Sequence, residues 1–269
     1  MTTYKLPSVP LFEIIGSPHH MGRMLGEQAA ALIRSMLDDY RTFMHKVSGF
    51  NWDEAVRESQ KYLPYAQAAF PQYVEEVAGI AEGAGVAFRD AWLLNCYEGV
   101  AEDQKLMACT SIGANDDVTA DGHVYLAHNE DWISGDSKRV YLVRAVPDDG
   151  PPFLAMSYGP LLCNVGMNAA GIAVGIDSVY PTDVRVGIPR TRPAVAAVRA
   201  ALWARTDREA TYVLPATVQQ RIASAEAIGE AALRVRRDRR RLLVHAVVNE
   251  LLDGARALGE IDVARELRR

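Results

Sequence analysis

One cysteine stands where the character of the sequence changes from helical to strand-like. Cys109 follows Ala108 and precedes two hydroxyl residues, Thr110 and Ser111, in the run LMACTSIGAND. A cysteine thiol acts as a nucleophile when a base or cation nearby favours its thiolate. A free cysteine is also a common small residue of protein cores. Cys109 therefore has two interpretations, one catalytic and one structural.

Three polar residues downstream accompany Cys109 at a distance. Asn129 and Asp131 fall near the end of the next strand-like run, GHVYLAHNEDW, and Asn168 falls in the glycine-flanked turn of CNVGMNAAGIAVG. Asp131 can be read simply as a strand-end aspartate. Asn168 can be read as a turn residue, because asparagine tolerates the left-handed conformation.

The order of these motifs carries a resemblance to a known family. ACTS, then DG followed by HNEDW, then GMNAAGIAVG and VGIPR resemble the acyl-coenzyme A:6-aminopenicillanic acid acyltransferase family, the isopenicillin N acyltransferase type of N-terminal-nucleophile hydrolase. The segment LFEIIGSPHHMGRMLGEQ, with Gly22 and Gly26, is similar to the family's N-terminal segment. The resemblance implies an αββα sandwich and a precursor that cuts itself between Ala108 and Cys109.

The resemblance also implies a role for each candidate residue. Cys109 would hold both the thiol and the α-amine freed by cleavage, and an α-amine with a pKa of about 7.7 to 8.0 exchanges protons readily at neutral pH. Asp131 corresponds to a carboxylate that orients this amine and favours its charged form. Asn168 corresponds to an amide donor of the oxyanion hole. Asn129 is expected to be a structural hydrogen-bonder, and His128 a hydrogen-bonded strand histidine.

The function implied is that of a self-processing cysteine amidohydrolase or acyltransferase. Its substrate would be a small N-acyl compound with a non-peptide C–N amide bond, attacked through a thioester intermediate, with an acyl-CoA as an alternative donor. No cofactor or metal is expected, since no histidine pairs with a carboxylate at zinc-site spacing, and ANDDVTADG lacks the closing Glu of a calcium loop.

Two other functions remain open from the sequence. The first is a catalytically silent, unprocessed homologue that acts as a binding or assembly protein. The second is a papain-like thiol enzyme, whose histidine partner would have to be His123, His128 or His245.

Helical patterns precede the cysteine and are expected to form its support. A short β-like run from Leu11 leads to Ser17 as N-cap and Pro18 as the first helical residue. Further helices are predicted over residues 53–69, 71–83 and 88–98. Residues 1–108 are therefore expected to form a mainly helical, propeptide-like segment that becomes a small subunit after cleavage.

Short alternating runs separated by turn residues follow Cys109 and predict an antiparallel sheet. The fold class is accordingly α+β, with residues 109–269 as the catalytic αββα segment. A helical pattern resumes at Pro193. After about residue 210 helix formers replace the strands expected of the family, so residues 210–269 form an atypical helical C-terminus in which Asn249 is the one candidate for a further oxyanion asparagine.

The composition of the chain indicates which kinds of partner it does not favour. A formal net charge of −5 over 269 residues gives no attraction for nucleic acid or an anionic membrane surface. No run has the length of a signal peptide core or a bilayer span, and three widely spaced cysteines indicate neither a disulfide framework nor a metal site. A cytoplasmic location is expected. A homo-oligomer is a further expectation, because an incomplete sandwich leaves a sheet face to cover.

Overall fold

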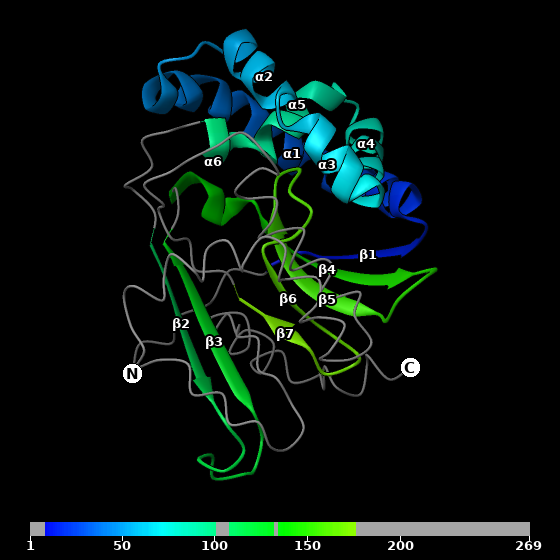
Figure 1. Ribbon diagram of the computed structural model, residues 1–269, viewed down its shortest axis with the longest axis vertical. Coiled ribbons are helices and arrows are strands. Elements are labelled where there is room, and N and C mark those ends of the chain that lie inside the picture. Colours follow the sequence, from blue (N-terminus) through cyan, green and yellow to red (C-terminus); the bar gives the residue numbers. More distant parts are fainter. Residues whose placement is uncertain (1–8, 101–107, 132–133, 176–269) are drawn as a thin grey trace.

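The computed structural model describes residues 9–100, 108–131 and 134–175. The predictions of a helix from Pro193, of an atypical segment over residues 210–269, and for His245 and Asn249 lie outside these residues. Helices and sheets are mixed as the sequence predicted, with the helices before Cys109 and most strands after it (Figure 1). The helices are α1 (Pro18–Ser48), α2 (Trp52–Gln60), α3 (Leu63–Ala69), α4 (Pro71–Ala84), α5 (Phe88–Leu94) and α6 (Tyr97–Val100), with a 3-10 turn η1 (Ser134–Lys138).

Helix α1 is the long support of the described fold. It begins after Ser17, whose backbone is extended, and Pro18 fits its first turn because that position needs no backbone N–H. It ends at Gly49, whose φ of 73° is the left-handed conformation of a helix C-cap. Met21, Leu25 and Ile33 recur at helical spacing and are completely buried along one side of α1.

Helices α1 and α4 approach each other so closely that only glycine fits at their contact. A Cβ on Gly22 would lie 2.0 Å from the backbone oxygen of Glu76, and a Cβ on Gly26 would lie 2.2 Å from that of Ile80. Gly79 and Gly83 face α1 in the same way from α4, with backbone oxygens at 2.1 Å from their Cβ positions. The paired glycines noted in the sequence are therefore helix-packing residues.

Two of the predicted helices were wrong in their extent. The pattern over residues 53–69 forms α2 and α3 instead of one helix, and Pro64 in the first turn of α3 explains the break because it cannot donate to Gln60. The pattern over residues 88–98 is divided at Asn95, whose side-chain amide donates to the backbone oxygens of Ala91 and Pro160.

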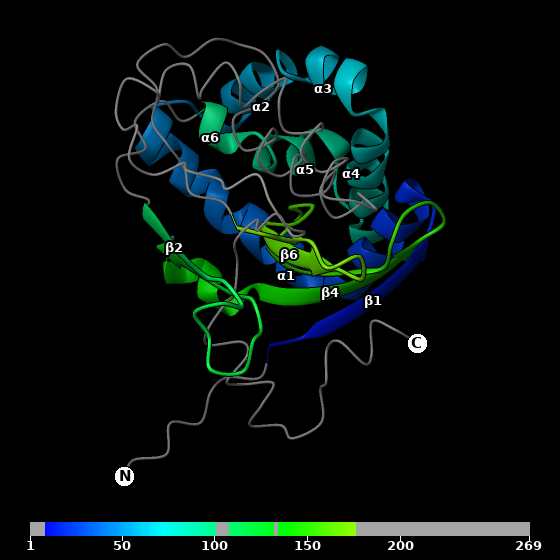
Figure 2. The same cartoon turned by 60° about the horizontal axis from the view of Figure 1, so that its bottom comes forward.

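Within the described residues there are two sheets, and the larger has five strands in the order β1-β4-β5-β6-β7. Strand β1 pairs with β4 in parallel, and the remaining pairs are antiparallel. Helix α1 contacts β1 and β4 and crosses one face of the sheet (Figure 2). The strands are β1 (Leu11–Gly16), β4 (Val140–Pro147), β5 (Phe153–Tyr158), β6 (Val165–Asn168) and β7 (Ala173–Val174).

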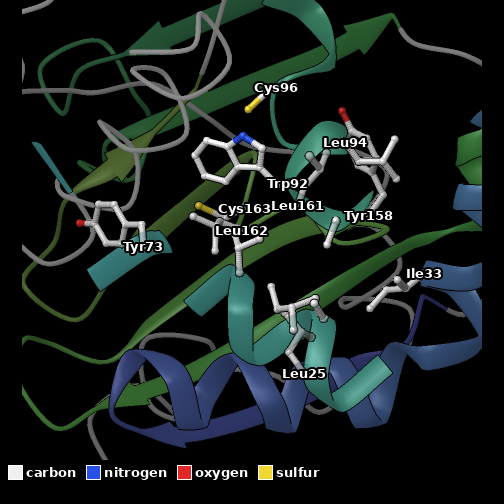
Figure 3. Close-up of a cluster of buried hydrophobic side chains, with 14 of the residues drawn as sticks. Leu25, Ile33, Tyr73, Trp92, Leu94, Cys96, Tyr158, Leu161, Leu162 and Cys163 are labelled. Atoms are coloured by element: carbon white, nitrogen blue, oxygen red, sulfur yellow. The ribbon is translucent and has the colours of Figure 1, made fainter. Parts of the chain in front are cut away.

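The core lies between this sheet and the helices. Trp92, Leu161 and Leu162 belong to it, together with the sulfur atoms of Cys96 and Cys163 (Figure 3). Both cysteines are completely buried and form no disulfide, so they act as small apolar residues of the core. Cys109 is the cysteine that retains partial exposure.

Candidate active site around Cys109

The second sheet is a hairpin that carries most of the candidate residues. Strand β2 (Ala108–Ala114) pairs antiparallel with β3 (Tyr125–Asp131), so that Cys109 is opposite Glu130 and Ser111 is opposite His128. Because side chains alternate along a strand and face their cross-strand partners, these four residues share one face of the hairpin. His128 on this face is buried, whereas Asn129 on the other face is exposed.

The backbone brings the predicted cleavage point next to Asp131. Ala108 is the register partner of Asp131, the last residue of β3, and Cys109 follows Ala108 directly. The Ala108–Cys109 peptide therefore starts one strand at the point where the neighbouring strand ends. The motifs ACTS and HNEDW, which lie about twenty residues apart in the sequence, meet here through hairpin pairing.

Glu130 is the residue of this hairpin that the sequence analysis missed. Its Oε1 accepts a hydrogen bond of 3.0 Å from the hydroxyl of Tyr158, and its Oε2 accepts one from the side-chain amide of Asn164. Burial raises the pKa of Glu130 to about 7; these two hydrogen bonds act in the opposite direction, and the negative charge of Asp136 adds to the increase. A carboxyl group with a pKa near 7 exchanges protons in the range used by general acids and bases.

A signal for Glu130 was present in the sequence. It adjoins Asp131 in HNEDW and stands two residues from His128, so strand alternation alone puts it on the His128 face. The pairing with Cys109 depends on hairpin register, which the length of the connecting segment does not fix.

His128 contacts the hydroxyl residue opposite it. Its Nδ1 lies 3.1 Å from the Oγ of Ser111. This contact is of the kind expected for a hydrogen-bonded strand histidine. His123, by contrast, lies in the exposed turn of the hairpin beside Asp121.

Asn168 ends strand β6 and is buried in the larger sheet. Its Oδ1 accepts hydrogen bonds of 3.0 Å from the backbone N–H groups of Ala170 and Ile172, which is the turn chemistry that asparagine favours. These contacts fix the plane of the amide group and therefore the direction of its Nδ2. The structure thus places Cys109 and Asn168 on different sheets, and Asn164, the residue before β6, links them through its bond to Glu130.

A buried ion pair holds the segment that follows the hairpin. Asp136 in η1 accepts a hydrogen bond of 2.6 Å from Tyr40 of α1 and one of 2.7 Å from Arg139. Arg139 also contacts Ser35 and Asp39 of α1. The segment that follows β3 is therefore anchored to α1 by a network of charged and polar groups.

Within the described part of the chain, no group of three or more His, Cys, Asp or Glu side chains is arranged to hold a metal ion. None of the helices formed by these same residues is long and apolar enough to span a membrane.

Part of the chain is similar in sequence to a known family of proteins. A family model described as acyl-coenzyme A:6-aminopenicillanic acid acyl-transferase matches residues 118–229, a range that contains Asp131 and Asn168 and begins after Cys109. Together with the relatives below, this match confirms the family resemblance that the sequence motifs indicated.

Two curated relatives match the chain. An uncharacterized protein of Archaeoglobus fulgidus is 27% identical over 228 residues, covering 72% of this chain and 36% of its own length. The acyl-coenzyme A:6-aminopenicillanic-acid-acyltransferase 40 kDa form of Emericella nidulans is 23% identical over 202 residues, covering 72% of this chain and 53% of its own length. The chain therefore spans between about a third and a half of the length of these relatives.

Proposed function

We propose that this protein is a self-processing cysteine amidohydrolase or acyltransferase that acts on small N-acyl compounds. The observation that carries the proposal is the position of the Ala108–Cys109 peptide at the start of β2, in register with Asp131 at the end of β3. The family match supports the general kind of reaction. An N-terminal nucleophile needs its scissile peptide near a carboxylate that can meet the new amine, and the register pairing of the Ala108 and Asp131 backbones supports the proposal.

Self-processing begins at the bond before the cysteine. The thiol of Cys109 attacks the carbonyl carbon of Ala108, the C–N bond breaks, and the nitrogen takes up a proton to become the α-amine of Cys109. Water then hydrolyses the thioester, which leaves a carboxylate on Ala108 and returns the thiol. Cleavage would separate residues 1–108, the small subunit, from residues 109–269, the catalytic segment. We expect this catalytic segment to form the αββα sandwich.

The same two groups of Cys109 then serve the substrate reaction. Its α-amine accepts the thiol proton, and the thiolate attacks the acyl carbon to give a tetrahedral intermediate. The side-chain amide of Asn168 stabilises the oxyanion, and Asp131 orients the charged amine. The intermediate collapses to a thioester as the leaving amine takes a proton. Water resolves the thioester in hydrolysis, and an acceptor amine resolves it in acyl transfer, with an acyl-CoA thioester as an alternative acyl donor.

Denaturing intact-mass spectrometry of the full chain tests the proposal. We expect the wild-type protein to yield two fragments divided between Ala108 and Cys109, and Cys109→Ala to remain one chain without amidase activity towards a panel of N-acyl amides. Thr110→Ala is the matched control, because Thr110 is the exposed neighbour on the other face of β2. A wild-type chain that stays intact at neutral pH would instead favour the silent, unprocessed homologue.

A further inference from the structure

The hairpin that carries Cys109 is joined to the five-stranded sheet by one acidic side chain. Glu130 accepts from Tyr158 at the end of β5 and from Asn164 just before β6. Asn164 is itself fixed, because its backbone N–H donates to the backbone oxygen of Met156 at 2.8 Å. Both oxygens of the Glu130 carboxyl group thus accept hydrogen bonds from residues of the five-stranded sheet or next to it.

These contacts connect the two ends of the candidate site. On one side, Glu130 is the cross-strand partner of Cys109, at a pairing where Cβ atoms are about 4.5 to 5.5 Å apart. On the other side, Asn164 leads directly into β6, which ends at Asn168. A shift of this link would move the nucleophile relative to the strand of the oxyanion donor.

We propose that Glu130 is a positioning residue that sets the Cys109 hairpin against the strand of Asn168 through its hydrogen bonds to Tyr158 and Asn164. The effect of Glu130 on catalysis rests on the proposed function. Its role as a link between the two sheets rests on the hairpin geometry alone. It assigns Glu130 no contact with substrate. Its effect is exerted through the separation of Cys109 and Asn168 and through the charge that it places beside the thiol.

The charge of Glu130 depends on its surroundings. Asp136 in η1 is a second acidic group near it, and Asp136 is itself paired with Arg139. Among the described residues, the same side of the hairpin also carries the titratable side chains of Tyr158 from β5, His128 on its own strand and Cys109 on β2. Ionisation of Glu130 through about pH 7 therefore puts a negative charge opposite Cys109 and disfavours the thiolate.

The first test measures the catalytic consequence. Glu130→Gln keeps the shape of the side chain but cannot accept at both ends, so we expect self-processing and kcat to decrease by about tenfold or more while KM changes little. Tyr158→Phe removes one of the two hydrogen bonds and should give a smaller decrease in the same direction. Asp121→Asn is the matched control, because it removes an exposed carboxylate from the turn of the same hairpin, and its rates should stay within about twofold of wild type.

The second test is independent of catalysis. Iodoacetamide labelling of the folded full chain reports on Cys109, since Cys96 and Cys163 are completely buried. We expect Glu130→Gln to label at least about threefold faster than wild type at pH 8, and the ratio to decrease at pH 5.5, where Glu130 of the wild type is protonated. A purely structural role would change the labelling without this dependence on pH.

The outcomes separate this inference from the proposed function. If the wild type neither processes nor hydrolyses amides, the proposed function fails, and the labelling experiment still decides the role of Glu130. If the wild type processes but Glu130→Gln processes as fast as Asp121→Asn, Glu130 is not a positioning residue. Equal labelling of Glu130→Gln and wild type at both pH values overturns the inference in either case.

Discussion

The hydroxyl oxygen of Ser111 lies 3.1 Å from Nδ1 of His128, across two register-paired positions of the β2–β3 hairpin. The imidazole is therefore directed at the hydroxyl residue opposite it, two residues along β2 from Cys109. A papain-like mechanism requires an imidazole that shares a proton with the cysteine thiol. In an N-terminal-nucleophile mechanism, the α-amine of the cysteine accepts the thiol proton instead.

His128→Gln distinguishes these mechanisms. We expect the variant to process itself and hydrolyse amides within about threefold of wild type, and to lose about 1 kcal/mol of stability with the Ser111 hydrogen bond. Intact-mass time courses and urea unfolding provide the measurements. A loss of activity by about a thousandfold at normal stability would identify a thiol–imidazole pair and contradict the proposed mechanism.

The contact of α1 with α4 gives a prediction for stability alone. In Gly79→Ala the new Cβ would lie 2.1 Å from the backbone oxygen of His19, so the helices must separate. Since overpacking typically costs about 1 to 3 kcal/mol, we expect a decrease of that size or larger in the free energy of unfolding. Gly135→Ala is the control, because the nearest atom to its Cβ would be the side chain of Arg139 at 3.6 Å. Equal urea midpoints for the two variants would show that this helix contact is less close than described.

The buried pair of Asp136 and Arg139 predicts a graded loss. Tyr40→Phe removes one hydrogen bond to Asp136 and should cost about 1 kcal/mol. Asp136→Asn leaves the buried guanidinium of Arg139 with Asp39, whose carboxylate is exposed, and should cost about 3 kcal/mol or more. Chemical denaturation of both variants measures the ratio. A smaller loss for Asp136→Asn than for Tyr40→Phe would contradict the importance of the ion pair.

Periodicity predicted the local elements of this fold, and long-range pairing escaped it. The spacing of Met21, Leu25 and Ile33 marks α1 correctly, because a helix buries one side whatever its partner is. The parallel pairing of Leu11–Gly16 with β4 joins segments more than a hundred residues apart, and neither sequence contains a signal that identifies its partner strand. Pro64 could have been used to divide the helix predicted over residues 53–69.

The candidate site shows the same division. Cys109, Asp131 and Asn168 were selected because ordered motifs resemble a family, and the hairpin register that joins Ala108 to Asp131 is a local consequence of β2 and β3 being neighbours. Glu130 owes its environment to Tyr158 and Asn164, which belong to another sheet. A carboxyl group that acquires its properties from tertiary contacts has no signature in its own strand.

The environment of Glu130 predicts how stability changes with pH. Burial raises its pKa from 4.5 to about 7, so the folded protein binds this proton more tightly than the unfolded chain does. The resulting stabilisation is fully present below about pH 4.5 and is lost as the pH rises through about 7. We expect the wild type to lose roughly 2 to 3 kcal/mol of unfolding free energy from this group over that range, relative to Glu130→Gln.

Urea unfolding of wild type and Glu130→Gln between pH 4.5 and pH 8 measures this difference directly. The free energy of unfolding of the wild type should decrease relative to that of Glu130→Gln as the pH rises. If the wild type is the more stable protein in acid, the difference between the two proteins should therefore become smaller. Asp121→Asn provides the flat control, because the hydrogen bond from Tyr125 lowers the pKa of Asp121, so the stabilisation from this group is complete above the ordinary pKa of an aspartate and does not change over this range. Parallel curves for wild type and Glu130→Gln would mean that water reaches the Glu130 carboxyl group, and that its link to Tyr158 and Asn164 is open in solution.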